Sequence, residues 1–394
     1  MALSTITVKD LVLTIPSGVS YLAVSVLKDG GECYKGASVV SGIANRIPQY
    51  SYDIPTLYNT EEHKSKLQNL IFGTATRIAN YKPITFLHFS DLHKQGYLFA
   101  RIVQYKKLYS TIIDDIINTG DLVDYYTDAI DQSVGQWNEG KATLSVIGNH
   151  DTRDNVDTSD WTAHAGLDAY NKFIAPYIEN WGTIIQPQDA ATVGKCYYYK
   201  DYNIDDSKLR LIVLDNMVMN STLSNYDATQ ITWLESVLAD AKTNGYTVVG
   251  AQHFPTALTK WDSAWCSKDH NGEGWGGMSV FFDAVETFIS GGGKFACWLA
   301  GHTHNNLLGT VKANNVEYTN QIVIAVDCSK IDPANQFSAR VNNTKTMDCF
   351  NIVSFDIRKK IVKVLRVGAD YDSYMRHAGV LCIDYVNKSI IYEQ

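Results

Sequence analysis

Several short apolar runs in this chain end in side chains that can coordinate metal ions, and this feature constrains the fold more than any other. The run "ITFLHFSDLH" ends in Asp91 and His93, and the run "IIDDIINTGDLVD" ends in Asp121 and Asp124. Three later runs, "LSVIGNHD", "VVGAQH" and "WLAGHTH", end in Asn149 with His150, in His253, and in His302 with His304. Ligand sites of α/β sheets lie at the carboxyl ends of the strands. Segments far apart in the sequence are therefore expected to meet in one crevice.

The residue types at these ends indicate which ions such a crevice would hold. Carboxylates, imidazoles and one amide oxygen suit manganese, iron or zinc better than calcium or copper(I). The candidate ligands are Asp91, His93, Asp121, Asn149, His253, His302 and His304. They are too many for one tetrahedral ion and suit two divalent ions that share a bridging carboxylate. Each motif alone is also typical of a surface loop or a core histidine, so the prediction depends on the ordered set.

The segments around these runs predict a layered α/β fold. From residue 84 onward, short apolar strands such as "LRLIVLDN", "YTVVGAQH" and "KFACWLAGH" alternate with helical patterns. Helices are expected at about residues 97–110 and 167–180, in "DATQITWLESVLADAKTNG" and in "GMSVFFDAVETFISGGG". Residues 1–55 alternate with period two and predict short strands. A helix is expected to follow, with Asn59 and Glu62 as its capping pair. Near the end, "FNIVSFDIRKKIVKVLRVG" predicts a hairpin.

Composition excludes some classes of function. The 394 residues are 45% hydrophobic and carry a formal net charge of −8, which disfavours a nucleic-acid binder. The seven cysteines are scattered without a CxxC pair, which argues against a disulfide framework and a cysteine zinc site. The beginning of the chain does not resemble a signal peptide, and no segment has the apolar length of a membrane span. A cytoplasmic location is expected, or a virion or surface location for a phage protein.

The ordered motifs "DLH", "GDLVD", "GNHD", "QH" and "GHTH" resemble the signature of the calcineurin-like metallophosphoesterases. The segment "ITWLESVLADA" is similar to the family's Trp-Leu helix before the lone histidine. The resemblance covers residues 84 to about 367 and implies a four-layer α-β-β-α sandwich with the site at the strand ends. On this basis, residues 81–370 are expected to form the metallophosphoesterase domain. Residues 1–80 are expected to form a β-rich attachment with a linking helix, and residues 371–394 a C-terminal β extension.

The resemblance also implies roles for single residues. The first ion would be held by Asp91, His93, Asp121 and His304, and the second by Asp121, Asn149, His253 and His302. The implied reaction is in-line attack at phosphorus by a hydroxide that bridges the two ions. His150 would assist as a transition-state stabiliser or proton donor, and Asp124 would orient His150.

Departures from the family pattern narrow the expected substrate. The family's protein phosphatases carry Arg after the second Asp of GDxxD and Glu after GNH, where this chain has Tyr125 and Asp151. This favours the phosphodiesterase and small-phosphoester branch. Arg153 is a candidate phosphate contact, although it is also typical of a surface arginine. The long segment 254–279 is expected to cap the site with Trp261, Trp265 and Trp275, or to pack these rings onto the body, while Tyr125, Tyr126 and Trp161 would add to the rim.

Two alternative functions remain open at this stage. One is a nuclease of the same fold, which the acidic balance disfavours. The other is a surface or virion-associated module whose phosphoesterase domain degrades a phosphate-containing cell-wall polymer. The substrate, the native metals and the oligomeric state are not determined by the sequence.

Overall fold

The computed structural model divides the chain into two compact units, Met1–Tyr52 and Asp53–Gln394. The structure describes residues 53–72, 82–129, 138–217, 228–255, 257–260, 279–304, 307–313, 316–326, 341, 344–369 and 381–391. All of these lie in the second unit. Of residues 1–55, which were predicted to form short strands, residues 1–52 lie outside the described residues and residues 53–55 begin helix α3 (Asp53–Tyr58). The division at residues 80 and 370 stays a prediction. Among the described helices, none is both long and apolar enough to cross a membrane.

The first sheet carries the strands that begin the αβ alternation. Its strand order is β15-β14-β13-β12-β1-β2-β3. The strands are β1 (Ile84–Phe89), β2 (Asp115–Asn118), β3 (Leu144–Ser145), β12 (Cys349–Asp356), β13 (Ile361–Gly368), β14 (Leu381–Asp384) and β15 (Ser389–Ile391). β1, β2 and β3 are parallel neighbours, whereas β12 and β13 form the predicted antiparallel hairpin, which is confirmed. β14 and β15 extend the same sheet.

The second sheet has the strand order β4-β5-β6-β7-β9-β11-β10-β8. Its strands are β4 (Ile184–Ile185), β5 (Tyr198–Ile204), β6 (Ser207–Val213), β7 (Thr247–Ala251), β8 (Ala257–Lys260), β9 (Lys294–Ala300), β10 (Leu307–Ala313) and β11 (Val316–Ala325). The central strands β6, β7, β9 and β11 run parallel, and the remaining strands pair antiparallel at the two edges. Strands β6, β7 and β9 were expected from their continuous apolar runs, which are typical of parallel strands buried on both faces.

The two sheets pack face to face. Phe86 of β1 contacts Tyr202 of β5 with ring centroids 5.1 Å apart. The Tyr202 hydroxyl donates to the Asp115 carboxylate of β2 at 2.5 Å, and Lys200 of β5 pairs with the same carboxylate at 2.7 Å. These contacts join the sheets by apolar packing and by satisfied polar groups.

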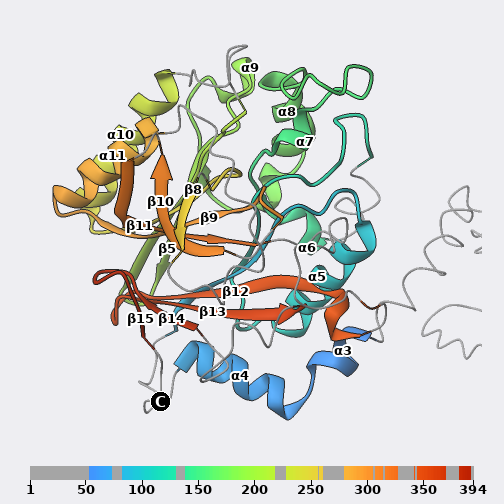
Figure 1. The fold of residues 1–394 in the computed structure, drawn as a ribbon, viewed down its shortest axis with the longest axis vertical. Coiled ribbons are helices and arrows are strands. Elements are labelled where there is room, and N and C mark those ends of the chain that lie inside the picture. The colour runs from blue at the N-terminus through green and yellow to red at the C-terminus, as the bar shows by residue number, and fades with distance from the viewer. Residues whose placement is uncertain are drawn as a thin grey trace, which may run out of the picture. The chain divides into compact units, whose positions relative to one another are not determined.

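Helices cover the outer face of each sheet. On the second sheet, α10 (Ala228–Asn244) packs against β7, and α11 (Ser279–Ser290) packs against β9 and β11 (Figure 1). On the first sheet, α4 (Glu61–Phe72) contacts β13, and α5 (Gly96–Leu108) packs Tyr105 against Phe350 of β12. Shorter helical segments are α3 (Asp53–Tyr58), α6 (Asn138–Lys141), α7 (Asn149–Thr152), α8 (Leu167–Ala169), η1 (Tyr170–Ile174), η2 (Ile178–Asn180), α9 (Ala190–Val193) and η5 (Lys345–Met347). The fold is therefore the predicted four-layer α-β-β-α sandwich.

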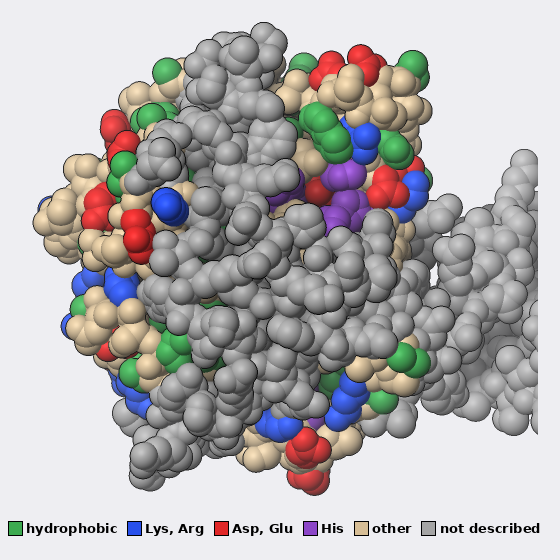
Figure 2. Space-filling view, in the orientation of Figure 1, with side chains coloured by type: hydrophobic (Ala, Val, Ile, Leu, Met, Phe, Trp, Pro, Cys, Tyr) green, Lys and Arg blue, Asp and Glu red, His purple; other side chains and the backbone are tan. Residues whose placement is uncertain are grey.

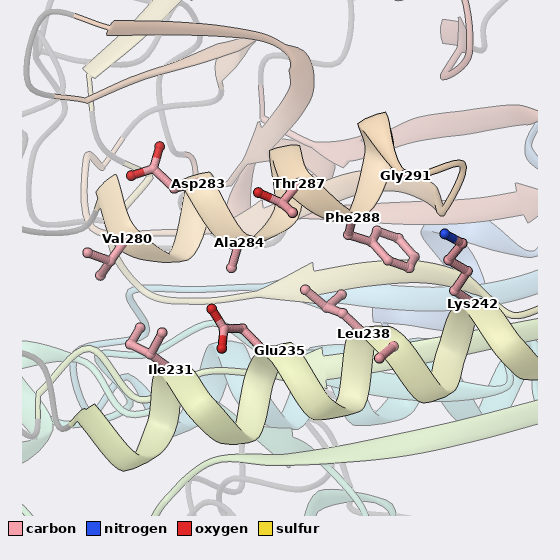
Figure 3. Close-up of a pocket in the computed structure, with 11 residues that line it drawn as sticks. Ile231, Glu235, Leu238, Lys242, Val280, Asp283, Ala284, Thr287, Phe288 and Gly291 are labelled. Carbon is pink, nitrogen blue, oxygen red and sulfur yellow. The ribbon is translucent and has the colours of Figure 1, made fainter.

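The paired helices α10 and α11 follow the expected amphipathic pattern. Leu234, Val237 and Leu238 of α10 are buried, and Gly245 ends the helix with a positive φ of 77°. A cavity of about 530 Å³ lies between the two helices, with Glu235 and Lys242 at its edge (Figure 3). None of the metal-type clusters among the described side chains includes residues of this cavity.

Helix α4 begins one residue later than the predicted capping pair indicates. The N–H of His63 donates to the Thr60 hydroxyl at 3.2 Å, so Thr60 is the capping residue. The predicted pairing of Asn59 with Glu62 is therefore wrong. Glu62 instead pairs with Lys66 along the exposed side of the helix.

Candidate metal centre

The structure brings together all of the side chains that end the apolar runs. Asp91 and His93 follow β1, Asp121 follows β2, Asn149 begins α7 just after β3, His253 follows β7, and His302 and His304 follow β9. The first sheet contributes four of these residues and the second contributes three. Figure 2 shows histidine side chains gathered in a hollow of the surface, with acidic and basic side chains beside them. Their roles as ligands stay a prediction, but their convergence is a property of the structure.

One group of ligand atoms comes from Asp91, His93, Asp121 and His304. The Nε2 atoms of His93 and His304 lie 3.0 Å apart, and His304 Nε2 lies 3.5 Å from an Asp91 oxygen. An oxygen of Asp121 lies 4.0 Å from His93 Nε2. Two imidazole nitrogens and two carboxylates therefore face one small volume.

A second group comes from Asp121, His253 and His302, and Asn149 lies within it. His253 Nε2 is 3.3 Å from an Asp121 oxygen and 3.0 Å from Asn149 Oδ1. His302 Nδ1 is 3.0 Å from the same Asn149 oxygen. Because Asp121 belongs to both groups, its carboxylate stands where a bridging ligand would stand. These donor types and their convergence fit two divalent ions.

Five of these residues have a left-handed backbone, which non-glycine residues rarely adopt. Their positive φ angles are 57° for Asp91, 47° for His93, 55° for Asp121, 68° for His302 and 49° for His304. Hydrogen bonds hold the strained turns, because the N–H of Asp91 donates to Gly120 O and the N–H of His93 donates to Asp121 O, each at 3.0 Å. Backbone strain of this kind concentrates at functional sites, where the surrounding structure over-determines it.

Two glycines are required by the close approach of the strand-end loops. A Cβ at Gly148 would lie 2.3 Å from an Asp121 carboxylate oxygen. A Cβ at Gly301 would lie 1.7 Å from Ser90 Oγ and 2.8 Å from an Asp91 oxygen. The glycines of "GNHD" and "GHTH" therefore make room for the two carboxylates of the cluster.

Asp151 has a role in the site that the sequence did not indicate. Its buried carboxylate accepts hydrogen bonds from the N–H groups of Gly148 at 2.9 Å, Asp121 at 3.0 Å, Leu122 at 2.9 Å and Val123 at 3.2 Å. Burial, together with the charge of Asp121, raises the pKa of Asp151 to about 7. Asp151 therefore ties the loop that carries Asp121 to the start of α7. The available signal was its place three residues after Gly148, where an acidic side chain can bond back to the helix start.

The structure corrects the predicted partner of Asp124. Its carboxylate accepts a hydrogen bond from His93 Nδ1 at 3.0 Å and so orients a candidate metal ligand. His150 Nδ1 instead donates to the main-chain oxygen of Asp124, also at 3.0 Å. The hydrogen bond that positions the His150 ring is therefore made by the main chain of residue 124, not by its carboxylate.

The electrostatics of the cluster indicate that cations belong in it. Burial opposes the charged form of His93 and His253, yet the carboxylates around them raise the pKa of each ring to about 9. Burial also opposes ionisation of Asp121, but His253 and other nearby imidazoles lower its pKa well below the usual value. Burial lowers the pKa of His302 and of His150. Without metal, the buried carboxylates are therefore balanced by protonated imidazoles, a balance that divalent ions would replace.

The candidate substrate contacts fall into two sets. Arg153 and Tyr125 lie beside the cluster, and the guanidinium carbon of Arg153 is 5.1 Å from the centroid of the Tyr125 ring. Trp161 lies next to His150, with ring centroids 5.1 Å apart. The predicted capping tryptophans Trp261, Trp265 and Trp275 lie outside the described residues.

Comparison with known proteins gives one family and a set of distant structural relatives. The family described as calcineurin-like phosphoesterase matches residues 84–306, which contain every candidate ligand. No curated protein matches the chain. Among solved structures, the chain is similar to a dimetal phosphatase from Danio rerio, with 12% identity, 73% of this chain and 96% of that chain covered, and a TM-score of 0.43. It is also similar to the NAD nucleotidase of Haemophilus influenzae, with 13% identity, 79% and 54% covered, and a TM-score of 0.36.

Proposed function

Because the chain belongs to the calcineurin-like phosphoesterase family, we propose that it is a dinuclear metal-dependent phosphodiesterase. The observation that carries the proposal is the Asp121 carboxylate, which takes part in both groups of ligand atoms. The ions would be held by Asp91, His93, Asp121 and His304 on one side and by Asp121, Asn149, His253 and His302 on the other. Manganese, iron and zinc all suit this set of oxygen and nitrogen donors.

Two divalent ions held by these residues would supply a nucleophile at neutral pH by lowering the pKa of water, and would offset charge on the phosphoryl oxygens. The protein contributes orientation. The N–H of His150 donates to Asp121 Oδ1 at 2.8 Å, and the His93 and His150 rings are 4.5 Å apart, so His150 lies beside the cluster. Its other ring nitrogen, Nε2, is not taken up by the bond to the Asp124 main chain and is the group that would donate a proton to the leaving oxygen.

The first test measures hydrolysis of bis-p-nitrophenyl phosphate by the manganese-loaded protein. We expect His150→Ala to lower kcat by about 100-fold or more, because general acid catalysis typically contributes this much. Metal content provides the control, since His150→Ala should retain the metal of the wild type and Asp121→Asn should lose most of it. Full activity in His150→Ala would remove this residue from the mechanism.

A second comparison tests the diesterase assignment. The wild type should hydrolyse bis-p-nitrophenyl phosphate with a higher kcat/KM than p-nitrophenyl phosphate. The departures at Tyr125 and Asp151 from the protein-phosphatase pattern support this order. A clear preference for the monoester would favour a phosphatase instead and would leave the dinuclear site intact.

A further inference from the structure

Two cationic side chains flank Tyr125 at the rim of the cluster, but only one of them is neutralised. Lys94 Nζ pairs with Asp124 at 3.1 Å and with Asp128 at 3.3 Å. Arg153 also lies over the Tyr125 ring, yet no carboxylate among the described residues lies within ion-pair distance of it. The rim therefore presents one positive charge that the described part of the protein does not compensate.

The Arg153 guanidinium is held in place by groups that leave its end nitrogens available. Its central carbon lies 3.9 Å from the centroid of the Trp161 ring, a cation–π contact, and its Nε donates to Thr158 O at 2.9 Å. None of the described residues accepts a hydrogen bond from either of its Nη nitrogens. A guanidinium fixed in this way offers a planar pair of donors that matches a phosphate or carboxylate.

Hydrogen bonds to main-chain atoms hold Arg153 and Trp161 next to His150. Thr152 Oγ1 donates to Trp161 O at 2.6 Å, and the N–H of Tyr126 donates to Arg153 O at 3.0 Å. The Trp161 ring meets the His150 ring edge to face, at 5.1 Å and 74°. A row of rings thus runs from His93 through His150 and Trp161 to the guanidinium, and Figure 2 shows basic and apolar side chains bordering the histidines.

We propose that Arg153 is a specificity-determining residue that binds a second anionic group on the leaving-group side of the substrate. The inference rests on the proposed function, because it assumes that the scissile phosphate occupies the metal cluster and that the leaving group faces His150. Preferred substrates then carry a second phosphate near the scissile one. A nucleoside diphosphate ester and a chain of repeating phosphodiesters share this chemistry.

A binding experiment tests the proposal without requiring turnover. Calorimetry on the manganese-loaded full chain compares propane-1,3-diphosphonate with propylphosphonate, which differ only in the second anionic group. The wild type should bind the diphosphonate about tenfold more tightly or better, as expected for a charge-assisted hydrogen bond. Arg153→Met, which retains an apolar side chain against Trp161, should bring the two affinities to within about twofold. Arg153→Lys should give an intermediate preference, because it keeps the charge and loses the paired donors.

The matched control is Arg358→Met, which removes an arginine that pairs with Asp206 at 2.7 Å on the surface. This variant should keep the wild-type preference. The proposal is overturned if the wild type shows no preference for the diphosphonate, or if Arg153→Met retains it. Thermal unfolding of each variant with bound manganese confirms that the fold persists.

A hydrolysis experiment then distinguishes the two sources of the second anion. ADP-ribose represents the nucleotide, a glycerol phosphate trimer represents the polymer, and bis-p-nitrophenyl phosphate lacks a second anion. A higher kcat/KM for either of the first two that falls in Arg153→Met supports the proposal and identifies the source. If none is hydrolysed while the diphosphonate preference depends on Arg153, the phosphodiesterase function fails and the anion site stands.

Discussion

Asp121 is the residue on which both halves of the cluster depend. Its carboxylate faces His93 and His253, its backbone is held in a left-handed turn, and Asp151 binds its N–H. The seven candidate ligands could be predicted from the sequence because each directly follows an apolar run. The role of Asp151 and the partner of Asp124 could not be predicted, because hydrogen bonds between separate loops depend on how those loops meet.

The corrected position of Asp124 leads to a prediction at this scale. Asp124→Asn should raise the manganese dissociation constant about tenfold or more, because the variant loses the charged partner that orients His93. At saturating manganese, kcat for bis-p-nitrophenyl phosphate should return close to the wild-type value, since the His150 bond to the main chain remains.

The control is Asp128→Asn, which removes a carboxylate that pairs with Lys94 and does not bond to an imidazole. It should leave the manganese dissociation constant nearly unchanged. If Asp124→Asn instead depresses kcat at every manganese concentration, Asp124 acts on His150 as the family resemblance first implied.

At the scale of elements, long periodic segments were predicted well and irregular ones were not. Helices α10 and α11 and strands β6, β7 and β9 lie where their patterns placed them. The helical stretch expected at residues 167–180 is instead split into α8, the π-helical turn η1 and the 3-10 turn η2. Strands β5 and β10 were not predicted, because antiparallel strands near the sheet edges depend on neighbours that the local pattern does not reveal. Strand β11, which pairs in parallel with β9, was not predicted either.

The packing of α4 on the first sheet predicts how stability depends on pH. His63 of α4 is buried against Tyr105 of α5, and its Nε2 lies 2.7 Å from the Tyr105 hydroxyl. Burial, with smaller effects of Lys345 and Lys66, lowers the pKa of His63 to about 4. In the unfolded chain His63 therefore takes up a proton near pH 6.5, whereas in the folded chain it stays neutral down to about pH 4. Stability falls as pH decreases from 6.5 towards 4, by up to about 3 kcal/mol from this residue.

We expect His63→Gln to reduce this loss, as measured by urea unfolding in EDTA at pH 7, 6 and 5. His164→Gln, which replaces a histidine that contacts Asp154 and Asp168 near the surface, is the control and should keep the wild-type slope. Some slope should remain in His63→Gln, because burial also lowers the pKa of His88, to about 3. If the free energy of unfolding of His63→Gln falls with decreasing pH as steeply as that of the wild type, other groups cause the acid sensitivity.

At the scale of the whole molecule, bound metal would join the two sheets. The ligands come from the ends of β1, β2 and β3 in one sheet and of β7 and β9 in the other. Metal that binds only the folded chain stabilises it by about 2.7 kcal/mol at 100 times its Kd. Chelation should therefore lower Tm by several degrees.

The stabilisation of the fold by bound metal should increase with pH. The pKa values of His93 and His253 are raised to about 9, so both rings are protonated at neutral pH and must release protons when metal binds. The difference in Tm between manganese-loaded and EDTA-treated protein should grow from pH 6 to pH 8. Scanning calorimetry at pH 6, 7 and 8 measures it, and a difference that stays constant or shrinks would contradict the proton exchange.

The sequence by itself determined the fold class, the family resemblance and the identity of the residues in the cluster. These properties depend on the order of residues within single segments. An apolar run followed directly by a metal-binding side chain can be recognised without knowing which other segments pack against it. Only the tertiary structure decided which sheet each strand joins, that the Asp124 carboxylate bonds to His93, and that Arg153 lies over aromatic rings beside His150. Distances between atoms from separate loops depend on the packing of the two sheets, and no single segment contains that information.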